Sequence, residues 1–139
     1  AEASETTYEP VKYISSHPEG KSVKTTRPAT NPSIGKEAIK NGRYKCAVDA
    51  SHLTFRKNDG TIYMEVHHLI PLEQQGAFEN KLDTKANLVP VCPLCHKLIH
   101  YGCFFDKKPI ITRLYEERKE QLKASGLDIS LEKMLSFYE

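Results

Sequence analysis

The spacing of cysteines and histidines in the second half of the chain restricts its fold more than any other feature. Cys92 and Cys95 are separated by two residues, a knuckle spacing typical of zinc ligands. His96 follows directly and His100 lies four residues later, so a helix would place both imidazoles on one face. An i, i+4 histidine pair commonly supplies two ligands to one metal ion. The alternative is two histidines on a solvated helix face.

The segment after the knuckle predicts a helix over residues 93–101. Pro93 suits the first helical position, and Gly102 suits the position beyond the end. At about 100° per residue, three apolar side chains gather opposite the histidines, and we expect them to pack inward. They are Leu94, Leu98 and Tyr101.

A second histidine pair, His67 and His68, stands near the end of an alternating apolar run over residues 63–70. This run predicts a strand, in which neighbouring rings point to opposite faces. Both rings can serve one site only if the strand twists or ends there, and Pro71 favours an ending. The alternative is one packed ring and one solvated ring.

These residue types suit hydrolysis of a phosphodiester. The reaction needs a base to deprotonate water, a cation to oppose the charge on the phosphoryl oxygens, and a group that orients the base. One ring of the doublet can be the base, because histidine titrates near neutral pH. The other three imidazoles can hold the cation. Asn87 could brace the base or its loop, although an asparagine before a short strand is often only a turn residue.

A second metal cluster is predicted to be structural. Cys46 and His52 could join Cys92 and Cys95 in a tetrahedral Cys₃His zinc site with no open position. Such a site would stabilise a domain whose apolar core is small. Cys103 remains, and we expect it to be a buried apolar residue and not a ligand.

Residues 45–101 resemble the HNH endonuclease family, in particular its McrA-type branch of modified-DNA restriction nucleases. The resemblance lies in KCAVDASHLTF, YMEVHHLIPL and ANLVPVCPLCHKLIHYG. It implies an α+β, ββα-metal fold, with two strands and a helix around one divalent cation, and products with 5′-phosphate and 3′-hydroxyl ends. It also implies roles for five residues: His68 as general base, Asn87 as the residue that positions base and loop, and His67, His96 and His100 as metal ligands.

The choice of catalytic metal follows from the ligand types. Many family members have Asp where His67 stands, so this site is richer in nitrogen. Imidazoles suit Zn²⁺, Ni²⁺, Co²⁺ or Mn²⁺ better than Mg²⁺.

The remaining elements are predicted from local patterns. Residues 1–30 are polar and predict a flexible tail or linker. Within it, the only residues expected to dock on the domain are Tyr8, Val11, Tyr13 and Ile14. Residues 31–139 are expected to form the domain. A short helix is expected over residues 32–41, and a hairpin with its turn at residues 58–60. The site core spans residues 44–102. Packing helices occupy residues 110–139, one beyond Pro109 and one after Ser130.

Composition limits the class of protein only broadly. The chain has 139 residues, enough for one domain, and its net charge of +2 does not by itself indicate a nucleic-acid partner. It has neither a bilayer-spanning apolar run nor a signal-peptide pattern, so we expect a soluble, cytoplasmic protein. Because its first residue is Ala and not Met, we expect it to be excised from a larger protein.

The functional hypothesis is a metal-dependent DNA endonuclease, the nuclease domain of a restriction or defence enzyme, working as a homodimer or with a separate recognition domain. Two alternatives are a non-catalytic zinc module that binds nucleic acid or protein, and a non-specific nuclease toxin. The histidine-rich site favours the enzyme, since a binding module needs no such cluster. Candidate phosphate contacts are Arg43, Lys45, Arg56, Lys57, Lys97, Lys107 and Lys108.

Overall fold

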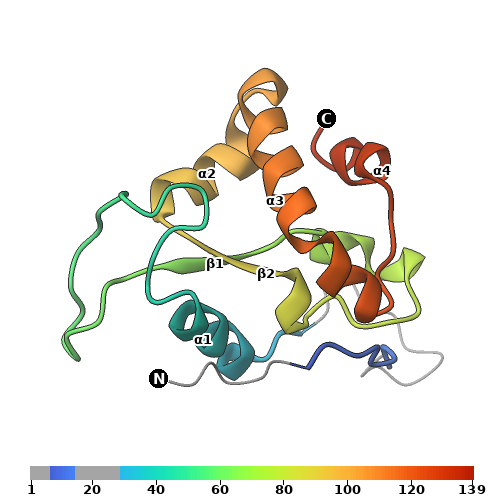
Figure 1. Cartoon of the computed structure of the whole chain (residues 1–139), viewed down its shortest axis with the longest axis horizontal. Helices are drawn as coiled ribbons and strands as arrows, with labels where there is room; N and C mark the ends of the chain where they lie inside the picture. The colour runs from blue at the N-terminus through green and yellow to red at the C-terminus, as the bar shows by residue number, and fades with distance from the viewer. Residues whose placement is uncertain (1–6, 15–28) are drawn as a thin grey trace.

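The computed structural model describes residues 7–14 and 29–139. In that part of the chain, helices surround a small antiparallel sheet (Figure 1), so the predicted α+β class is confirmed. In chain order the elements are α1 (Pro32–Asn41), β1 (Glu65–His68), η1 (Leu72–Ala77), η2 (Lys85–Asn87), β2 (Leu88–Val91), α2 (Pro93–Tyr101), α3 (Phe104–Ala124) and α4 (Leu131–Ser136). None of the described helices is both long enough and apolar enough to span a membrane.

The two strands form the centre of the domain. β1 and β2 pair in antiparallel register, with His67 opposite Val89 and His68 opposite Leu88. α1 lies on one side of the strands, while α2 and α3 lie on the other side (Figure 1). Gly42, after α1, lies so close to Pro90 that a Cβ at this position would be 2.9 Å from the proline Cγ. The core around the strands includes Leu69, Ile70, Val89, Ile99, Ile111, Leu114, Leu122 and Met134.

The predicted hairpin has its turn but only a trace of its strands. The Lys57 N–H donates to the Thr61 carbonyl at 2.8 Å, and Gly60 takes a left-handed φ of 89°. Beyond the turn, the arms share one isolated bridge between Arg56 and Ile62. Leu53 is 92% exposed, so the arm that precedes the turn has no apolar face packed against the core. A two-stranded ribbon without such packing is only marginally stable, which explains why regular pairing stops.

α2 has the predicted bounds, but the prediction that Leu94, Leu98 and Tyr101 pack inward is wrong. Leu94 and Tyr101 are 78% and 79% exposed, and the buried residues of the helix are Cys95 and Ile99. Relative to the prediction, the buried face is rotated about a third of a turn around the helix axis. The reason is that Cys95 belongs to the cysteine cluster, which fixes the side that faces the core.

α3 begins at Phe104, so the prediction that it starts beyond Pro109 is wrong. Pro109 lies inside the helix, at its sixth residue. The helix loses one hydrogen bond there, since proline has no N–H to donate to the Phe105 carbonyl. Cys103 is the N-cap residue and is exposed, contrary to the prediction that it is buried; its thiol lies 3.3 Å from the Asp106 carboxylate. α4 begins directly after Ser130, as predicted.

Part of the segment predicted as a tail contacts the domain. Within residues 7–14, Lys12 forms an isolated antiparallel bridge with Asn80. The Tyr13 N–H donates to the Glu79 carbonyl at 2.8 Å, and Tyr8 packs against the core. Of the residues expected to dock, however, Val11 and Ile14 are exposed. The predicted tail over residues 1–6 and 15–28 falls outside the described residues.

Candidate active site and metal centres

Three imidazoles meet between β1 and α2. His96 and His100 lie one helical turn apart, and His67 on β1 faces them. One ring nitrogen from each lies within 4.8 Å of the other two. The Nε2 atoms of His96 and His100 are 3.1 Å apart. Two nitrogens bonded tetrahedrally to one zinc ion lie about 3.3 Å apart, so this pair has the spacing of ligands that share an ion.

The orientation of His96 is fixed by a carboxylate that the sequence analysis did not identify. The Glu65 Oε1 atom lies 2.8 Å from His96 Nδ1, and the Tyr63 hydroxyl donates to Glu65 Oε2 at 2.7 Å. These hydrogen bonds, that from His96 first, lower the pKa of Glu65. With Nδ1–H donated to Glu65, His96 presents the Nε2 lone pair to the cluster. Glu65 lies two residues before His67, and strand periodicity could have placed both on one face.

His67 is buried, with 2% of its surface exposed. Its Nε2 atom lies 2.7 Å from the Tyr138 hydroxyl, which in turn donates to the Leu69 carbonyl at 2.5 Å. Burial, and then the neighbouring imidazoles His100 and His96, lower the pKa of His67 well below its ordinary value. The ring is therefore neutral near pH 7, as a metal ligand must be.

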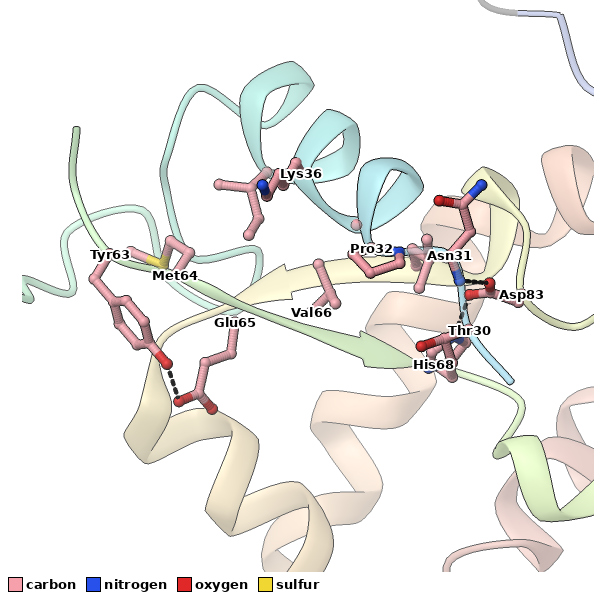
Figure 2. Close-up of a pocket in the computed structure, with 13 residues that line it drawn as sticks. Thr30, Asn31, Pro32, Lys36, Tyr63, Met64, Glu65, Val66, His68 and Asp83 are labelled. Atoms are coloured by element: carbon pink, nitrogen blue, oxygen red, sulfur yellow. Dashed lines mark hydrogen bonds and ion pairs between the residues drawn. The ribbon is translucent and has the colours of Figure 1, made fainter. Parts of the chain in front are cut away.

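His68 points to the opposite side of β1, as the strand period predicts. Its Nε2 atom lies 2.8 Å from Asp83 Oδ1, and Asp83 Oδ2 accepts from the Asn31 N–H at 2.7 Å (Figure 2). Burial tends to raise the pKa of Asp83, but the hydrogen bonds from His68 and Asn31 lower it overall. Asp83 therefore remains a carboxylate and fixes the orientation of the His68 ring. Nothing in the sequence near Asp83 pointed to this role.

Both rings of the doublet nevertheless border one cavity, of about 510 Å³. β1 ends at His68, and the chain turns there into the loop before η1. His96 and His100 line the same cavity. The ending of the strand, and not a twist within it, thus lets two rings on opposite faces reach one space.

Asn87 does not line this cavity and is fully buried. Its Oδ1 accepts from the Ile70 N–H at 2.7 Å, and its Nδ2 donates to the carbonyls of Ile70 and Leu82. Its own carbonyl accepts from the Leu69 N–H. Among the described hydrogen bonds of its side chain, none goes to an imidazole. Of the two roles considered for Asn87, this geometry suits the bracing of the loop that follows His68.

Comparison with known proteins relates this part of the chain to nucleases. Residues 55–102 match the HNH endonuclease family. Those residues are an HNH domain. The chain is also 35% identical, over 85 residues, to the type IV methyl-directed restriction enzyme EcoKMcrA of Escherichia coli K12. The aligned part is 61% of this chain but only 28% of that enzyme.

A second candidate metal centre joins the HNH domain to the residues before it. The thiols of Cys46, Cys92 and Cys95 and a ring nitrogen of His52 lie within 4.8 Å of one another. His52 Nδ1 is 3.6 Å from the Cys92 sulfur and 3.3 Å from the Cys95 sulfur. Tetrahedral zinc bonds would separate a nitrogen and a sulfur by about 3.6 Å. The geometry therefore fits a closed Cys₃His zinc site.

The electrostatics of the thiols also suit a cation. Burial tends to raise the pKa of Cys46, but backbone N–H groups, with that of Cys92 first, lower it to about 7. Burial and the neighbouring thiols raise the pKa of Cys95. Two thiolates cannot easily lie side by side in a buried cluster, whereas a zinc ion would stabilise all three. Asp49 lies 3.6 Å from His52 Nε2, a position from which it can orient that ligand.

Most of the basic residues predicted to contact phosphate are on the surface of the protein. Lys97 borders the cavity beside the histidines of the HNH domain. Lys107 differs, since it is 8% exposed and its Nζ lies 3.5 Å from the Tyr138 carbonyl. It also lines a smaller cavity, of about 270 Å³, together with His67 and His100, so its contact with a nucleic-acid backbone stays a prediction. The exposed members of the set are Arg43, Lys45, Arg56, Lys57, Lys97 and Lys108.

Proposed function

We propose that this chain is a metal-dependent endonuclease that hydrolyses the phosphodiester bonds of DNA, as the nuclease part of a restriction enzyme. One observation carries the proposal: three imidazoles spaced for a single ion share a cavity with His68, whose ring is oriented by Asp83. A zinc module that only binds a partner needs neither feature. The match to the HNH endonuclease family supports the same chemistry.

His67, His96 and His100 would hold the catalytic ion, and exposed His100 leaves the cluster open to the solvent side. A divalent cation bound there would oppose the negative charge that builds on the phosphoryl oxygens. Imidazole ligands favour Mn²⁺, Ni²⁺, Co²⁺ or Zn²⁺ over Mg²⁺. Cys46, His52, Cys92 and Cys95 would hold a structural zinc ion.

His68 acts as the general base. Because its Nε2–H donates to Asp83, its Nδ1 carries the lone pair that accepts a proton from water. The water oxygen bonds to phosphorus and the bond to the 3′ oxygen breaks. That oxygen takes a proton from solvent, which leaves a 3′-hydroxyl and a 5′-phosphate.

Recognition of the target belongs to a part of the protein beyond this chain, either a separate domain or a second subunit. The relative is named as methyl-directed, but this chain aligns with only 28% of its length. In the described residues, basic side chains that could contact phosphate are exposed, but they do not form an element that reads bases. The partner proposed for this chain is therefore the DNA backbone near the cavity.

Nicking of supercoiled plasmid tests this function. The chain is incubated with Mn²⁺, Ni²⁺, Co²⁺ or Mg²⁺, with a chelator as the metal-free control, and His68→Ala is assayed in parallel. Removal of the base should lower the rate about 10²-fold to 10⁴-fold. Calorimetric titration with Mn²⁺ should show that the variant still binds the metal.

Two results would contradict the proposal. Equal nicking by His68→Ala would exclude the mechanism, and an inactive parent protein with every metal would favour the zinc-binding module. A parallel assay on single-stranded RNA separates a DNA enzyme from a general nuclease, because preferential cleavage of RNA would contradict the substrate proposed here.

A further inference from the structure

Tyr138 lies outside the matched HNH segment and outside the motifs that carried the family resemblance, yet its side chain reaches the proposed catalytic metal site. It follows α4 in the chain, 71 residues after His67. Its ring is buried, and its hydroxyl lies between two atoms of the segment that carries the histidine doublet. These atoms are His67 Nε2, at 2.7 Å, and the Leu69 carbonyl oxygen, at 2.5 Å.

The single proton of this hydroxyl decides the direction of both hydrogen bonds. A carbonyl oxygen can only accept, so the proton between Tyr138 and Leu69 must be that of tyrosine. The same oxygen must then accept at its other contact, which makes His67 Nε2 the donor. A neutral imidazole with a proton on Nε2 has its lone pair on Nδ1.

We propose that Tyr138 is a positioning residue of the metal centre, which holds His67 in the tautomer whose Nδ1 lone pair is available to the ion. This inference rests on the proposed metal site. It assigns to the C-terminal helical segment a role in that site, in the same way that Glu65 orients His96.

The surrounding contacts hold Tyr138 in place. Its backbone N–H donates to the Leu135 carbonyl at 3.0 Å, and its carbonyl oxygen lies 3.5 Å from Lys107 Nζ. α4 packs on α3, and its residue Met134 is fully buried. The hydroxyl is therefore presented by a packed element, which is what precise orientation of a metal ligand requires.

The first test reads the tautomer without a catalytic metal. Two-bond ¹H–¹⁵N correlations of the histidine rings, recorded on protein that carries one equivalent of zinc, enough for the Cys₃His site alone, show which nitrogen of each ring is protonated. We expect His67 to carry its proton on Nε2. A proton on Nδ1 would overturn the proposal, whatever the protein does to DNA.

The second test compares Tyr138→Phe with a matched control, Tyr115→Phe. Tyr115 also donates its hydroxyl to a carbonyl, that of Ile129 at 2.6 Å, but it is not among the residues around the histidine cluster. Loss of the Tyr138 hydroxyl should weaken Co²⁺ or Mn²⁺ binding about 10-fold to 100-fold and alter the visible spectrum of bound Co²⁺. Tyr115→Phe should leave both unchanged, although each variant loses one hydrogen bond.

The possible outcomes separate this proposal from the proposed function. Unchanged Co²⁺ affinity and spectrum in Tyr138→Phe would overturn the positioning role. Equal weakening in both variants would also overturn it, because the effect would then reflect stability alone. A correct tautomer and a Tyr138-dependent Co²⁺ site in a protein that cuts no DNA would contradict the endonuclease and leave the positioning role intact.

Discussion

At the scale of single residues, the site depends on groups that hold each histidine in one orientation. Glu65 contacts His96, Tyr138 contacts His67 and Asp83 contacts His68. An imidazole has two ring nitrogens. The hydrogen-bond partner of one nitrogen fixes the tautomer, and thereby decides whether the other nitrogen carries a proton or a lone pair. Three histidines close together could therefore still fail as a site if their rings carried the wrong protons.

Replacing Asp83 tests this at the proposed base. In Asp83→Asn the amide can present its NH₂ to His68 Nε2, which would favour the wrong tautomer. We expect plasmid nicking to fall at least about 10-fold, and at most by the 10⁴-fold that a general base contributes. Binding of Mn²⁺ should stay within about 2-fold of the parent protein, since Asp83 does not contact the histidine cluster. Undiminished nicking would show that His68 needs no orienting carboxylate.

The same carboxylate predicts a dependence of stability on pH. The pKa of Asp83 is lower in the folded protein than its ordinary value of about 3.9. Its ionised form therefore stabilises the fold above about pH 4, and this contribution is lost as the pH falls through the folded-state pKa. Urea unfolding of the parent and of Asp83→Asn from pH 6 to pH 2.5 should show a difference in free energy that shrinks in acid. A difference independent of pH would contradict the prediction.

At the scale of elements, α2 links the two candidate metal centres. Cys95 faces the cysteine cluster, and His96, the next residue, faces the histidine cluster. Ile99 anchors the helix in the core between them. The N-terminal end of this helix is thus fixed by the cysteine ligands, and the direction in which its histidines project follows from that attachment.

Loss of a zinc ligand should therefore destabilise the domain. Cys95→Ser should reduce the bound zinc measured by atomic absorption, and should lower the free energy of unfolding by more than about 2 kcal/mol, because a structural zinc site contributes directly to folding. Cys103→Ser is the matched control, since Cys103 is exposed and lies outside the cluster. If both variants retained full zinc and stability, the cluster would not be a zinc site.

At the scale of the whole molecule, segments from both ends of the described chain complete a domain whose site lies in the middle. Tyr138 reaches His67 from the C-terminal side, while residues 11–13 pair with residues 79–81. The Lys81 N–H donates to the Val11 carbonyl at 2.7 Å, close in sequence to Asp83. Figure 1 shows the N-terminal segment, in blue, beside the part of the chain that precedes β2.

Removal of the N-terminal segment should cost stability without removing either metal site. A chain without residues 1–14 loses two backbone hydrogen bonds and the contact of Tyr8 with the core. We expect a loss of about 1–3 kcal/mol in urea unfolding, with unchanged zinc content. A chain without residues 1–6 alone is the control. Equal stability of the two truncated chains would mean that residues 7–14 contribute nothing measurable.

The sequence by itself determined the features that depend on neighbours along the chain. The bounds of α1 and α2 follow from a proline in the first turn and a glycine at the end, and the opposite directions of His67 and His68 follow from the strand period. The cysteine-rich ligand set was predicted from spacing, whereas the resemblance to the HNH family implied the set His67, His96 and His100; the structure brings each set together. Local backbone geometry suffices for these predictions because it repeats over a few residues.

Only the tertiary structure decided which surfaces are buried and which partners orient the histidines. The exposed side of α2 was predicted wrongly. Helix periodicity shows which residues share a face, but it does not show which face packs against the core. Asp83 and Tyr138 lie 15 and 71 residues from the rings that they contact. Neither contact leaves a pattern in the sequence, since each arises where separate elements pack, and packing depends on the whole set of buried side chains at once.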